Sequence, residues 1–176
     1  MSSIPLHPAL VHLPLGLAFI LPILAIGFTW ALWTKRIQAR SWLVIIVLQA
    51  ILLAAGLLAM NTGEREGDRV EKVVPERAIE THEAYAEQFL WGVGITLAVG
   101  ILVLIPRSGM TRAFSIATVA GTLAVAGLAV RVGHAGGQLV YVHNAAAAYA
   151  SSNTRSAQVQ TSGAPEQHPE SNGDQD

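Results

Sequence analysis

Apolar residues in this chain occur in long uncharged runs, whereas a soluble amphipathic helix carries a polar face with charges every three or four positions. Lys, Arg, Asp and Glu are absent from four stretches: Met1–Thr34, Ser41–Gly63, Gln88–Pro106 and Ala113–Val130. A bilayer core of about 30 Å requires about 20 apolar residues in helical conformation. The pattern therefore predicts four transmembrane helices, at about residues 10–33, 42–60, 76–105 and 113–134.

The expected fold is an all-α, integral membrane four-helix bundle with both termini on its outer side. In hydrocarbon, only helices and closed barrels satisfy every backbone group, and these runs lack the alternating pattern of barrel strands. The third helix is expected to begin near Glu76 and to project beyond the bilayer, because Pro75 suits the first turn of a helix.

The end of the fourth helix is expected at Gly136 and Gly137, because glycine tolerates positive φ and commonly terminates helices. The apolar residues 139–141 could then fold back over the mouth of the bundle, which would return His143 towards His134. Alternatively, the glycines only end the helix, which is their commoner use.

Two segments differ in composition. Residues 1–150 contain all the predicted helices and form one transmembrane domain. Residues 151–176 are rich in Ser, Gln, Asn, Gly and Glu. They have little apolar surface to bury and are predicted to form a disordered tail. The first helix is not expected to be a cleaved signal peptide, because no basic residue precedes it.

The loops predict the orientation. The first and third loops carry only basic charges, which are Lys35, Arg36, Arg40, Arg107 and Arg112. By the positive-inside rule these loops are cytoplasmic, which places both termini and the acidic loop 61–87 outside. Three tryptophans near the cytoplasmic loops are expected to form an inner aromatic belt: Trp30, Trp33 and Trp42.

Composition excludes several classes of protein. Hydrophobic residues make up 52% of the 176 and charged residues 13%, cysteine is absent and the net charge is −1. The chain is too apolar for a disordered regulator. It cannot form a thiolate metal site, an iron–sulfur centre or a disulfide framework. It also lacks the basic footprint expected of a nucleic-acid-binding protein.

Five histidines are predicted to lie at one level, near the outer membrane surface: His7, His12, His82, His134 and His143. Imidazole is the commonest metal ligand and also binds haem iron axially. His12 and His134 are the preferred opposed pair for a cofactor, and all five are candidate metal ligands. The alternative is that these histidines cap helices or lie between lipid and solvent without a ligand.

Charged residues near this level complete the candidate site. Glu64, Glu66 and Glu83 are candidates for carboxylate ligands or for groups that orient a histidine. Arg131 is the only formal charge within the outer half of a predicted transmembrane helix, and such charges usually have a partner. Glu64, Glu66 or a haem propionate would serve; alternatively, Arg131 extends one turn to the surface.

Small residues recur on the last two helices, including Gly92, Thr96 and Gly100 on the third and Gly121 and Gly127 on the fourth. Such residues let helices approach closely in lipid. Tight helix packing is therefore favoured over a cofactor groove.

Two segments carry a family resemblance: His7-Pro-Ala-Leu-Val-His-Leu-Pro14 and Gly133-His-Ala-Gly-Gly-Gln-Leu-Val-Tyr-Val-His143. Together they resemble signatures of a bacterial inner-membrane family that is known only as a domain of unknown function with four transmembrane helices. Leu13 and Asn144 depart from the family pattern but leave the histidines in place. The central Thr81-His82-Glu83 also resembles a His–Glu step of that family. The resemblance therefore supports the same five histidines and implies location in the bacterial inner (plasma) membrane, but implies no activity.

Two functions follow as hypotheses. In the first, the outer histidines bind haem b or another transition metal, and the protein exchanges electrons with a periplasmic redox carrier or a membrane quinol. In the second, the protein is a non-catalytic accessory or assembly subunit of a membrane complex. In both, the lipid bilayer surrounds the helices and no nucleic acid is bound.

Overall fold

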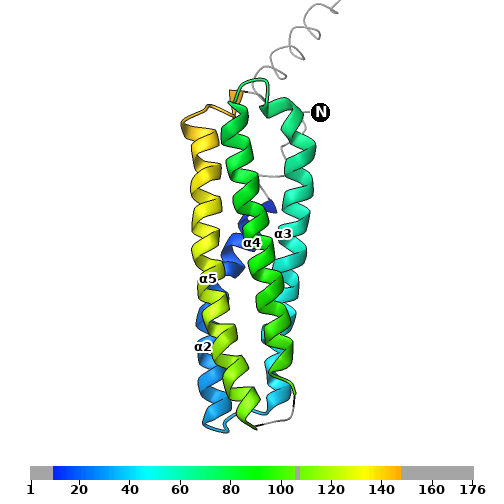
Figure 1. Ribbon diagram of the computed structural model, residues 1–176, viewed down its shortest axis with the longest axis vertical. Helices are drawn as coiled ribbons and strands as arrows, with labels where there is room; N and C mark the ends of the chain where they lie inside the picture. The colour runs from blue at the N-terminus through cyan, green and yellow to red at the C-terminus, as the bar shows by residue number, and fades with distance from the viewer. Residues whose placement is uncertain (1–9, 106–107, 148–176) are drawn as a thin grey trace, which may run out of the picture.

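A computed structural model describes residues 10–105 and 108–147, apart from the side chains of residues 66–69 and 108. The described chain is helical and contains no strand (Figure 1). Its elements are α2 (His12–Trp33), the 3-10 helix η1 (Ala39–Trp42), α3 (Leu43–Val70), α4 (Glu76–Leu102) and α5 (Ser108–Tyr141). Within this part of the chain, four helices are long and apolar enough to cross a membrane, as the sequence predicts.

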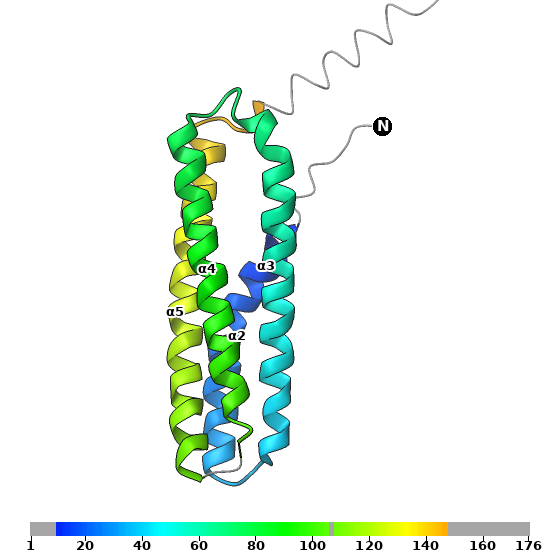
Figure 2. The same ribbon diagram turned by 45° about the vertical axis from the view of Figure 1, so that its right-hand side comes forward.

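The four long helices form an antiparallel bundle in which each packs against its neighbours in sequence, and α2 also packs against α5. We call the end with the α3–α4 turn the outer end and the opposite end the inner end, after the predicted orientation. At 1.5 Å per residue, α2 is about 33 Å long and α5 about 51 Å. Figure 2 shows α2 beginning partway up the bundle, so that, of the described helices, α3, α4 and α5 form its outer end.

The helices extend further than the apolar runs. α3 continues to Val70, about ten residues past its predicted end, and α5 starts at Ser108. α4 begins at Glu76 after Pro75, as predicted. The helical extensions are polar, so the acidic loop consists mostly of the outer turns of α3 and α4.

The predicted end of the last helix is wrong. α5 passes through Gly136 and Gly137 and ends only at Tyr141, and no described glycine has positive φ. Residues 139–141 therefore do not fold back over the bundle. Glycine permits a turn but does not impose one, whereas each further helical residue satisfies its own backbone groups near lipid. The left-handed conformation occurs instead at Asn144, with φ of 54°, which asparagine tolerates.

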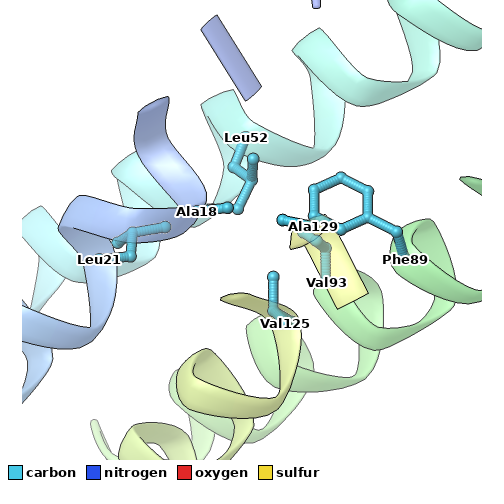
Figure 3. Close-up of a cluster of buried hydrophobic side chains, with 7 residues drawn as sticks. All are labelled: Ala18, Leu21, Leu52, Phe89, Val93, Val125 and Ala129. Carbon is cyan, nitrogen blue, oxygen red and sulfur yellow. The ribbon is translucent and has the colours of Figure 1, made fainter. Parts of the chain in front are cut away.

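Two apolar clusters form the core. The larger cluster joins all four helices through the buried side chains of Ala18, Leu21, Leu52, Phe89, Val93, Val125 and Ala129 (Figure 3). The smaller lies at the inner end around Trp42, Ile45 and Val103. Because both clusters draw on several helices, they fix the positions of the helices relative to one another.

Trp42 belongs to this core and not to the predicted aromatic belt. It is fully buried, and its Nε1 donates a hydrogen bond of 3.0 Å to the carbonyl oxygen of Gly100. Trp30 and Trp33 are exposed, as a belt requires. The guanidinium groups of Arg36 and Arg112 lie over their rings, at 4.8 and 4.4 Å from the ring centroids.

α4 and α5 share the most extensive helix interface, and it depends on small residues. A Cβ added to Gly121 would lie 2.6 Å from Oγ1 and 3.2 Å from Cβ of Thr96. A Cβ on Gly92 would lie 3.0 Å from Leu128. These contacts confirm the packing role predicted for the small residues, although Gly127 has no neighbour within 4 Å of its Cβ position.

We expect Gly121→Ala to destabilise the bundle by about 1–3 kcal/mol, as overpacking does in other protein interiors. The new methyl group would overlap Thr96, whose branched side chain cannot rotate away cheaply. Thermal unfolding of the purified protein in detergent measures the effect. Gly127→Ala is the matched control and should leave stability unchanged or slightly higher, since alanine favours helix. Equal losses in the two variants would contradict the close α4–α5 contact.

Candidate functional site at the outer end

His82 is the candidate histidine that the structure places between two helices. It lies in the second turn of α4, is half-buried, and has a buried Nδ1 atom. Its ring faces Gly136 of α5, where an added Cβ would lie 3.2 Å from Cε1 of His82. Gly136 thus provides the space that the imidazole occupies, which explains a glycine here within a continuous helix.

A pocket of about 300 Å³ opens next to this contact, between the first turns of α4 and the last turns of α5. Polar groups of both segments line it, including Arg77 and Thr81 from α4, Gln138 from α5, and His143 beyond the helix end. The hydroxyl of Thr81 donates to the carbonyl oxygen of Arg77 at 2.7 Å. The pocket therefore offers a guanidinium, an amide and an imidazole at the outer end of the bundle.

His134 lies in the same outer part of α5, but its imidazole is exposed. Its Nε2 lies 3.3 Å from Nε2 of Gln138, one turn further along the helix. The amide nitrogen can only donate, so the histidine nitrogen is the acceptor in this pair. A metal ion at that nitrogen would have to displace Gln138.

Arg131 is exposed and pairs with an aromatic ring. Its guanidinium carbon lies 4.6 Å from the ring centroid of Tyr85, on the neighbouring helix α4. A cation over an aromatic face at an exposed site contributes about 0.5–1 kcal/mol. This contact holds the positive charge against the α4–α5 pair, beside the helical turn that carries His134.

Glu83 is exposed on α4, and the other candidates lie outside this pair of helices. His12 is exposed at the start of α2, and Glu64 is exposed in the outer turns of α3. The pair of His12 and His134 is therefore not enclosed between helices, and its role as a ligand pair stays a prediction. His7 lies outside the described residues, as does the side chain of Glu66.

No three His, Asp or Glu side chains gather in a geometry that could hold a metal ion within residues 10–105 and 108–147. The described histidines therefore do not form a polyhistidine metal centre.

Comparison with known proteins identifies no relative of this chain. No family model, no curated protein and no solved structure matches it. The resemblance carried by the two histidine-containing segments accordingly stays a prediction.

Two contact residues of the site were not predicted from the sequence. These are Tyr85, which contacts Arg131, and Gly136, which lies against His82. Tyr85 follows His82 by three residues, so both lie on the α5-facing side of α4. That spacing was visible in the sequence. The role of Gly136 was not, because it depends on which side chain of another helix lies opposite.

We expect Gly136→Ala to displace the His82 ring and to lower stability by about 1 kcal/mol, at the low end for overpacking. The shift of the His82 Cε1–H resonance, in histidine-labelled protein, reports the displacement. Gly137→Ala is the matched control, because its Cβ position has no neighbour within 4 Å. Equal shifts in both variants would show that the His82 ring does not contact α5 at Gly136.

Proposed function

We propose that this is a multi-pass membrane protein whose outer histidines bind a haem b or a transition-metal ion for electron transfer. The observation that carries the proposal is the enclosure of His82 between α4 and α5, beside a polar pocket that includes His143. An imidazole packed against a neighbouring helix has a restricted orientation, which favours metal and haem binding. His82 is the main ligand in this proposal, with His143 and His134 as candidates for a second.

The donor chemistry of the site suits such a group. A bound iron or copper ion supplies one-electron redox chemistry. Neutral imidazole binds such ions well. Arg77 in the pocket and Arg131 over Tyr85 provide positive charge that would stabilise an anionic substituent such as a propionate. Helix contacts position these side chains, so the protein contributes orientation and charge.

The described candidates favour electron exchange at the outer surface only. His82, His134 and His143 all lie towards the outer end of α4 and α5. In this proposal, a periplasmic carrier or a membrane quinol exchanges electrons with the centre from that side. Transfer across the bilayer would require a second centre in another protein.

The test is an absorbance spectrum and a metal analysis of the full chain, purified after expression with ample haem and metal. We expect a Soret band, or about one bound metal ion per chain. His82→Ala should raise the Kd of the bound haem or metal at least about tenfold, a loss of ~1.4 kcal/mol of binding free energy, and so lower its occupancy. His168→Ala is the control and should retain full occupancy.

A wild-type protein that carries neither haem nor metal would contradict the proposal. Equal occupancy in His82→Ala and His168→Ala would reject His82 as the ligand.

The accessory-subunit hypothesis has a separate support. The end of α5 exposes apolar side chains at the outer end, with exposed fractions of 89% for Tyr141 and 69% for Val142. Such residues suit contact with a partner subunit or with lipid at the membrane surface. A photo-reactive amino acid at position 141 would distinguish the two, because it would cross-link to one protein in native membranes or to lipid alone.

The proposed orientation has both termini outside the bacterial inner membrane. The absence of native cysteine makes a direct test possible. Glu80→Cys in α4 should react with a membrane-impermeant maleimide in intact spheroplasts, whereas Gln38→Cys should react only after the membrane is opened. Both positions are exposed, so access to the reagent depends on the side of the membrane. The reverse pattern would invert the topology.

A further inference from the structure

The interior of the bundle contains polar side chains well away from the histidines. Buried hydroxyl-bearing residues follow one face of α5 at spacings of three and four positions: Ser115, Thr118 and Thr122. Thr96 of α4 and Gln49 of α3 are buried beside them. These residues extend from the inner end towards the larger apolar cluster.

Gln49 is the unusual member. It is 1% exposed, and neither its Oε1 nor its Nε2 has a hydrogen-bond partner among the described residues. Leaving a buried amide without a partner costs about 1–3 kcal/mol. It is also the only Gln, Asn or charged residue between Ser41 and Met60, within an otherwise apolar run. A buried amide at this position in a membrane-spanning helix favours a small bound molecule as its partner.

A small cavity lies next to the side chain of Gln49. Its volume is about 10 Å³, and its lining includes Gln49 together with Thr96 and Thr122. The rest of the lining consists of apolar side chains that belong to the larger core cluster, drawn in Figure 3. About 10–15 Å³ is the space that one water molecule needs, and a buried water typically makes about three hydrogen bonds.

The two threonines have acceptor capacity left for such a molecule. Each hydroxyl donates to a carbonyl oxygen of its own helix, Thr96 to Gly92 at 2.7 Å and Thr122 to Val119 at 2.8 Å. The lone pairs of both hydroxyl oxygens therefore remain available. The amide of Gln49 supplies a donor and an acceptor.

We propose that this cavity is a binding site for one ordered water molecule, which links α3, α4 and α5 in the membrane interior. The water accepts a hydrogen bond from Gln49 and donates to Thr96 and Thr122, which gives three bonds. The ligand class follows from the size and the charge of the site. The cavity accepts one small molecule, and its polar groups are all neutral, which favours water over an ion.

The test uses full-length protein labelled with ¹⁵N-glutamine, in detergent micelles. Water-selective Overhauser spectra detect a long-lived water beside the Gln49 side-chain amide, whose resonance is identified by its absence in Gln49→Met. We expect a direct dipolar cross-peak between water and the Gln49 amide. Gln38 and Gln88 are exposed and should show only exchange with bulk water.

Matched threonine variants locate the site. Thr122→Val removes one acceptor from the cavity and should abolish the cross-peak, while Thr122→Ser retains the hydroxyl and should keep it. Thr118→Val is the control, because Thr118 is equally buried on the same helix but does not line the cavity.

Absence of the cross-peak in the wild-type protein would overturn the proposal. So would its loss in Thr118→Val together with its retention in Thr122→Val, because the Gln49 amide would then depend on a different part of the core.

Discussion

Helices in a bilayer gain little from burying apolar side chains against each other, because lipid is equally apolar, so they associate where their surfaces fit most closely. In this protein the closest fit is between α4 and α5. Gly121 leaves space for Thr96, and Gly136, four turns further along α5, leaves space for His82. The same interface thus sets the packing in the membrane interior and encloses the imidazole at the outer end.

Polar and apolar side chains occupy different parts of the buried face of α5. Towards the inner end the buried face of α5 carries hydroxyl groups, at Ser115, Thr118 and Thr122. Beyond them it becomes apolar at Val125 and Ala129, and only past these residues do Arg131 and His134 follow. The two polar regions are therefore separated by the larger apolar cluster. Any chemistry at the outer histidines is insulated from the polar groups of the inner half.

The sequence predicted the number and type of the helices well, because the uncharged runs respond to one strong constraint, the thickness of the bilayer. The start of α4 at Glu76 was also predictable from Pro75. The length of α5 was not, since Gly136 and Gly137 resemble a helix end whenever their tertiary contacts are unknown. Trp42 was misplaced for a similar reason: an aromatic residue near a loop suits both a membrane surface and a core.

The height of the candidate histidines along the bundle could be predicted from the sequence, but their contacts with other helices could not. The positions of His82 and His134 along their helices, and of His143 just beyond α5, follow from the sequence. Which of them faces another helix depends on the rotation of α4 and α5 about their axes, and a run that is apolar on all sides does not specify that rotation. Gln49 is recognisable in the sequence as an isolated amide in an apolar run, but its burial beside α4 and α5 depends on the fold.

The short α2 has a consequence for local stability. Within the described residues α2 begins at His12, so the outer turns of α3, α4 and α5 have one described helix fewer against which to pack. Segments with few buried contacts open at lower free energy than the core and exchange their amide hydrogens sooner. We therefore expect the turns that carry His82 and the polar pocket to open more easily than the core, and a ligand bound there would stabilise their closed form by mass action.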